Sequence, residues 1–114
     1  MEKVITFNGG STGLSLYLTI MRQSHGTYLD ATDFTFKDRA DPILEMEELS
    51  AGDDTQMYEW RNDETAWKDG QYIVVVYQQI GAEPALDTDA VLATATLNVR
   101  RNAIRERRYS YSGR

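Results

Sequence analysis

Strict alternation of apolar residues is the feature of this 114-residue chain that most limits its fold. From residue 14 to residue 21 every second residue is leucine or isoleucine, and from 91 to 99 every second residue is valine, alanine or leucine. A repeat of two residues belongs to a β-strand that buries one face. Because each such face needs an apolar layer opposite it, the pattern predicts packed sheets.

Other segments fit the same architecture. Residues 3–7, 27–29, 34–36, 55–62 and 72–80 are short and rich in β-favouring residues, and turn formers such as NGGSTG, HG, DATD, SAGDD and DG separate them. Residues 73–77 are apolar on both faces, which predicts a central strand covered on both sides. Segment 43–49 suits either a short helix or a strand, and we favour the strand because turns flank it. The sequence predicts an antiparallel, Ig-like β-sandwich of about seven strands.

Length and composition predict a single domain. A chain of this size builds one modest core. It has no cysteine for a disulfide or a thiolate site, and we expect neither a secretory signal nor a membrane span, because no long apolar run is present.

Charge divides the chain in two. Residues 1–99 hold six Lys/Arg and seventeen Asp/Glu, a net charge of −11, whereas residues 100–114 hold six arginines and one glutamate, a net charge of +5. We therefore divide the chain into a β-sandwich domain, residues 1–99, and an Arg-rich C-terminal arm, residues 100–114. An acidic body repels phosphate, so nucleic acid is not an expected partner of the domain.

The arm has three interpretations: a nucleic-acid contact, an arm that docks on another protein or another copy, and an inert tail. We favour docking, since Arg and Tyr are enriched at protein interfaces and the acidic body complements the basic arm. The expected interface residues are Arg100, Arg101, Arg105, Arg107, Arg108, Tyr109 and Tyr111.

No constellation predicts catalysis. His25 is the single histidine and adjoins Gly26 in an expected turn, and no serine lies in a GxSxG motif. The acids of DATD (30–33) and DTD (87–89) could bind calcium or serve a metal-dependent hydrolase, but they lack the EF-hand pattern. We expect no enzyme, no cofactor and no metal, with a solvated acidic surface as the simpler interpretation.

Three aromatic residues, Tyr58, Trp60 and Trp67, have two possible roles. Exposed on a flat sheet, they could stack on sugars and make the chain a carbohydrate-binding, host-adhesion module. Buried between sheets, they would form the core, which is the interpretation we favour.

Two blocks of sequence resemble a known family. The first, GLSLYLTIMRQSHGTYLDATDFTF, has the family's G-L-x-L-Y strand and its following hairpin; the second, GQYIVVVYQQIGAEPALD, has its G-x-Y-x-V-x-V-Y-x-Q strand and G-x-x-P-A-x-x-D loop. They are similar to a small β-sandwich domain of tailed-bacteriophage and prophage structural proteins. In place of the family's usual Asn-Gly turn the first hairpin has DATD, and the Arg-rich arm lies outside the pattern.

The resemblance implies a non-enzymatic virion protein, either a capsid decoration (cement) protein or a component of the tail, connector or fibre. Such a protein is assembled in the host cytoplasm and binds major capsid or tail proteins, as a homo-oligomer or in repeated copies. It also implies that residues 81–89 form a loop between the last two strands of the domain.

Overall fold

The computed structural model describes residues 3–38, 41–49, 56–62 and 67–111, with the backbone alone for 106–111. This part of the chain is all-β and antiparallel, and its strands form two sheets. The small sheet has the order β1-β7-β6: β1 (Lys3–Asn8), β7 (Met57–Asn62) and β6 (Glu47–Glu48). The predicted all-β class is confirmed, and the two layers are consistent with a β-sandwich.

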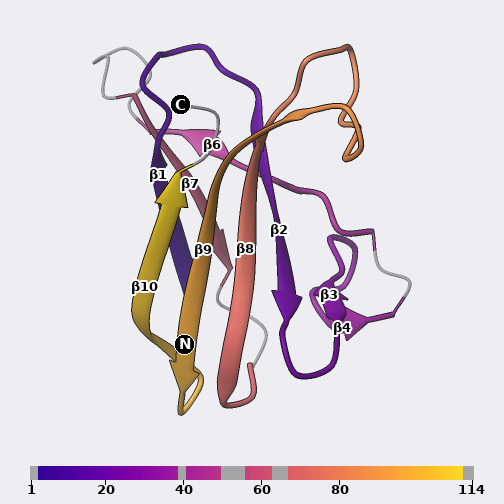
Figure 1. The fold of residues 1–114 in the computed structure, drawn as a ribbon, viewed down its shortest axis with the longest axis vertical. Helices are drawn as coiled ribbons and strands as arrows, with labels where there is room; N and C mark the ends of the chain where they lie inside the picture. Colours follow the sequence, from indigo (N-terminus) through magenta and orange to yellow (C-terminus); the bar gives the residue numbers. More distant parts are fainter. Residues whose placement is uncertain (1–2, 39–40, 50–55, 63–66, 112–114) are drawn as a thin grey trace.

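The large sheet has the order β10-β9-β8-β2-β3-β4, and β5 also pairs with β2. Figure 1 shows its long strands β8, β9 and β10 side by side. Its strands are β2 (Leu16–Arg22), β3 (Thr27–Leu29), β4 (Phe36–Lys37), β5 (Leu44–Glu45), β8 (Gly70–Gln78), β9 (Ala90–Arg100) and β10 (Ala103–Tyr111).

The core lies between the two sheets. The small sheet contributes Ile5, Phe7, Tyr58 and Trp60, and the large sheet contributes alternate residues of β2, β8 and β9. Leu18, Val74 and Leu97 are completely buried there. The apolar residues that recur at every second position therefore form the inner face of the large sheet, as predicted.

A β-bulge near the start of β9 interrupts the alternation of buried and exposed residues. Val76 pairs with Ala93, but the next residue of β8, Tyr77, pairs with Val91, which leaves Leu92 as an extra residue. Val91 is consequently exposed, whereas every second residue from Ala93 to Val99 is buried. The sequence pattern counted Val91 with the core because a bulge leaves no mark in apolar periodicity.

Two strands differ from the burial that the sequence predicted. Strand β8 was expected to be covered on both faces at residues 73–77, but there only Val74 and Val76 are buried and the other three residues are half-buried. Strand β2 was expected to bury one face, yet all five residues from Leu16 to Ile20 are buried. The second face of β2 is covered near Tyr17, whose ring stacks on Tyr77 with 5.1 Å between the ring centroids.

Segment 43–49 forms two short strands instead of the single strand favoured from the sequence. Strand β5 pairs with β2 in the large sheet, and β6 pairs with β7 in the small sheet. The chain thus crosses between the layers at Met46, so neither the short helix nor the single strand considered from the sequence forms.

A two-residue turn joins β9 to β10. Arg101 and Asn102 have φ values of 52° and 61°, the left-handed conformation that suits a tight hairpin. Asn102 Oδ1 accepts hydrogen bonds from the Trp67 backbone N–H at 2.7 Å and from the buried Lys3 ammonium. Lys3 Nζ also lies 5.6 Å from the centroid of the Trp67 ring. The turn is therefore anchored to β1 through Lys3 and to the segment before β8 through Trp67.

The sequence-based boundary between residues 99 and 100 falls within this hairpin. Residues 103–111 pair with β9 as the outermost strand of the large sheet, and Ala103 is buried. A chain ending at Val99 would therefore lose a paired strand, not only an appended tail.

The two-layer core predicts a contrast between two positions in β9. Replacing the fully buried Leu97 with alanine is expected to lower the free energy of unfolding by about 2–5 kcal/mol, the usual cost of a cavity at a buried leucine. Val91→Ala in the same strand, at a site 39% exposed, is expected to cost less than about 1 kcal/mol. Urea denaturation followed by fluorescence measures both, and equal losses would contradict the assigned core.

Candidate functional site: an acidic groove and a basic edge

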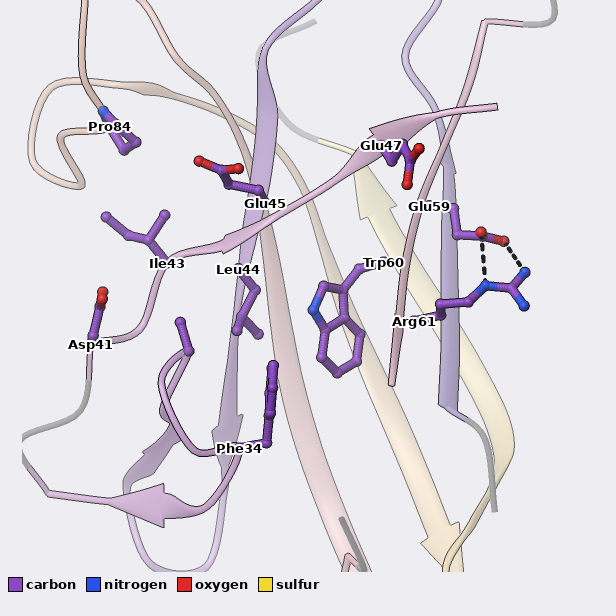
Figure 2. Close-up of a pocket in the computed structure, with 11 residues that line it drawn as sticks. Phe34, Asp41, Ile43, Leu44, Glu45, Glu47, Glu59, Trp60, Arg61 and Pro84 are labelled. Carbon is purple, nitrogen blue, oxygen red and sulfur yellow. Dashed lines mark hydrogen bonds and ion pairs between the residues drawn. The ribbon is translucent and has the colours of Figure 1, made fainter. Parts of the chain in front are cut away.

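A groove of about 790 Å³ lies beside the segment that crosses between the sheets. Its apolar lining consists of Ala31, Phe34, Ile43, Leu44, Trp60 and Pro84. Its charged lining consists of Asp41, Glu45, Glu47, Glu59 and Arg61. Figure 2 shows Phe34, Leu44 and Trp60 at the centre and the acids spread from Asp41 to Glu59. We call this feature the acidic groove.

The charges of the acidic groove are predominantly negative. Glu47 lies opposite Glu59 in the β6–β7 register. Arg61 binds Glu59 through two hydrogen bonds, from Nε to Oε1 at 2.9 Å and from Nη2 to Oε2 at 2.7 Å, and these lower the pKa of Glu59. Among the described residues, the exposed acids Asp41, Glu45 and Glu47 enter no ion pair. They leave the rim of the groove anionic.

The groove acids are spread out instead of converging. Within residues 3–38, 41–49, 56–62 and 67–111, no three His, Cys, Asp or Glu side chains are placed to hold one metal ion. Spread carboxylates are better matched to several positive charges along a peptide than to a single cation, which needs ligands converging on one point.

The DATD acids stabilise a loop. Asp30 accepts the backbone N–H groups of Thr32 at 2.7 Å and Asp41 at 3.2 Å, and the bond from Thr32 is the main cause of its lowered pKa. Asp33 lies 2.7 Å from Lys37 Nζ, and this contact is the main cause of its lowered pKa. Both carboxylates therefore have structural partners, and Asp30 fixes Asp41 at the groove.

Asp89 holds the loop between β8 and β9. Its Oδ2 accepts the Ala85 N–H at 2.7 Å and the Tyr17 hydroxyl at 2.5 Å, and its Oδ1 accepts the Ile80 N–H at 3.0 Å. These donors lower the pKa of Asp89, while burial, followed by Asp89 itself, raises that of Tyr17. The loop of residues 81–89 is thus held in place by Asp89, and it positions Pro84 at the groove.

The three aromatic residues considered for sugar stacking lie in the core. The exposed fractions are 1% for Tyr58, 6% for Trp60 and 3% for Trp67. Trp67 packs against Trp60 and Tyr72, with ring centroids 6.4 Å and 5.0 Å away. Stacking on a sugar needs an open ring face, so this burial supports the core interpretation favoured from the sequence.

The Gly-rich segment near the N-terminus is organised by Tyr58. The Tyr58 hydroxyl donates to the Ser11 carbonyl at 2.9 Å and accepts the Leu14 N–H at 2.9 Å. A Cβ on Gly9 would lie 2.7 Å from Tyr58 Cε1, so only glycine allows the backbone to pass this ring. The segment is therefore a turn packed on an aromatic residue.

The interface residues expected from the sequence lie in and beside the β9–β10 hairpin. Arg100, Arg101 and Arg105 are exposed. The backbone of β10 places Arg107 opposite Leu97 and Arg108 opposite Thr96. Tyr109 and Tyr111 lie opposite Ala95 and Ala93 in the same register. The structure thus assembles these residues along one edge of the large sheet.

Sequence reasoning missed the acidic groove as a unit. Its acids were counted as general surface charge, because residues 41–47, 59–61 and 84 meet only through the crossing of the chain between sheets. The one local signal was segment 43–49, whose mixed periodicity marked the crossing.

Comparison with family models, with curated proteins and with solved structures finds no match to this chain. The described residues contain no helix long and apolar enough to cross a bilayer.

The hydrogen bonds that Asp89 accepts predict that the stability of the fold depends on pH. Because the folded pKa of Asp89 lies below its ordinary value of about 3.9, the carboxylate stabilises the fold above that pH. This contribution is lost as pH falls through the lowered pKa. Asp89→Asn is expected to reduce stability at pH 7 and to make the loss of stability below pH about 4 shallower.

Thermal unfolding between pH 2 and 7 measures this effect. Asp87→Asn, two residues away and exposed, is the matched control and should follow the wild-type profile. Tyr17→Phe should lower the melting temperature at pH 7, since it removes the buried hydroxyl that Asp89 binds. Identical pH profiles for Asp89→Asn and wild type would contradict the brace.

Proposed function

We propose that this chain is a non-enzymatic structural protein of a bacteriophage virion, which assembles through its sheet edge and its charged surfaces. The observation that carries the proposal is the position of the Arg-rich segment as β10, the outermost strand of the large sheet. An outermost strand presents backbone groups on its outer side, where a neighbouring protein can add a strand.

Charge separation supports the same role. The basic residues of the C-terminal segment lie on one edge, while the acidic groove is lined by the β3–β4 turn, the crossing segment and β7. A subunit with opposite charges on separate surfaces can bind neighbours with a defined orientation, because complementary patches steer association and penalise wrong contacts.

The state of the carboxylates and of His25 agrees with a structural role. Asp30, Asp33 and Asp89 each fix a loop, and His25 lies on the surface with Ser24 Oγ 2.6 Å from its Nδ1. The resemblance of residues 13–34 and 70–87 to phage structural domains supports a virion as the assembly. We propose capsid decoration or a tail, connector or fibre position, with capsid or tail proteins as partners.

Particle association tests the proposal. Particles purified by density gradient from cells that produce the protein are expected to contain it in multiple copies, measured by quantitative mass spectrometry. The triple variant Arg105→Ala/Arg107→Ala/Arg108→Ala is expected to keep its β-rich circular dichroism spectrum and to lose at least about 90% of its incorporation, because several charged contacts are removed together.

Lys68→Ala, which alters an exposed cation outside β10, is the control and should load normally. Absence of the wild-type chain from particles, or normal loading of the triple variant, would overturn the proposal.

A further inference from the structure

Two exposed surfaces of this chain are complementary, because one carries carboxylates and the other carries arginines. One is the acidic groove, with exposed Asp41, Glu45 and Glu47. The other is formed by Arg100, Arg101 and Arg105 at the β9–β10 turn, which we call the basic hairpin. None of the residues that line the groove belongs to the hairpin, so both surfaces are available on one folded copy.

The basic hairpin is a rigid projection. Its turn contains only Arg101 and Asn102, and Asn102 is held by Trp67 and Lys3. The Arg101 N–H also donates to Asp69 Oδ1 at 2.8 Å. A turn that is fixed before binding loses little conformational entropy on docking, so its arginines are presented ready for contact.

The acidic groove suits arginine side chains in two ways. Its carboxylates can form charge-assisted, bidentate bonds with guanidinium groups. Its apolar floor, with Leu44 and Trp60, can pack the methylene stems of those side chains. Its volume of about 790 Å³ lies within the range of roughly 300–1,000 Å³ that is usual for binding pockets.

We propose that the acidic groove of one copy receives the basic hairpin of a second copy. The inference rests on the proposed function, which requires repeated copies, and it names the contact between them. The groove and the hairpin are different surfaces, so the contact is head-to-tail, and a pair of copies keeps one free hairpin and one free groove. Such a contact extends to a closed ring or a linear array.

Charge-swapped variants of the full chain test this contact. The groove variant carries Asp41→Arg/Glu45→Arg, and the hairpin variant carries Arg100→Glu/Arg105→Glu. Sedimentation velocity over a concentration series is expected to show self-association of wild type that weakens as salt is raised. Each variant alone is expected to show an apparent Kd at least about tenfold higher, because like charges now meet.

In an equimolar mixture of the two variants, each groove meets a hairpin of opposite charge on the other variant. The mixture is therefore expected to recover association, in assemblies where the two variants alternate. The control Asp38→Lys/Asp87→Lys changes two exposed acids outside the groove and should associate like wild type. Circular dichroism of each variant reports folding independently.

A wild-type chain that stays monomeric, unchanged association of both variants, or a mixture that associates no better than the separate variants would each overturn the contact. Binding of the groove only to basic segments of other proteins would give the first of these results. The particle experiment separates the two proposals: a chain that loads on particles but never self-associates refutes this contact alone, and one that self-associates but is absent from particles refutes the virion role.

Discussion

The apolar layer between the two sheets is the constraint on which the other features of this chain depend. Aromatic rings from both sheets and from the segment that leads into β8 meet there, with Trp67 packed between Trp60 and Tyr72. Burial of such rings is among the largest favourable contributions available to a domain of this size. Because Trp67 also donates to Asn102, the same layer fixes the basic hairpin, and because Trp60 and Leu44 reach the groove, it also forms the groove floor.

The core also determines the positions of the polar side chains that brace loops and turns. Asp89 satisfies two backbone N–H groups of the β8–β9 loop and the hydroxyl of Tyr17 in β2. Asn102 does the same for the Trp67 N–H and the Lys3 ammonium at the other end of the sheet. Buried donors need such partners, since an unmet hydrogen bond costs more than a satisfied one contributes. Within the part of the chain that the structure describes, the exposed groove acids Asp41, Glu45 and Glu47 have no comparable bracing contacts.

The sequence predicted the parts of the fold that alternation can encode. The inner face of β2 and residues 93–99 of β9 follow directly from period two, and the turn pairs located most strand ends. The β9 bulge, the two-sided burial of β2 and the split of segment 43–49 could not be predicted, because each depends on residues distant in sequence. The arginines at 100, 101 and 105 were recognised by composition, whereas the acidic groove required the folded chain to bring residues 41–47 beside 59–61 and Pro84.

The crossing at Met46 has a mechanical consequence for the sandwich. The segment is held by two register pairs to β2 and two to β7, so it connects the layers with far less backbone pairing than the long strands share within a layer. Local opening events favour elements of this kind, since few hydrogen bonds must break together. A tensile load that pulls the two sheets apart on this side would therefore break the pairs of β5 and β6 first. The pairing among β8, β9 and β10 would remain intact.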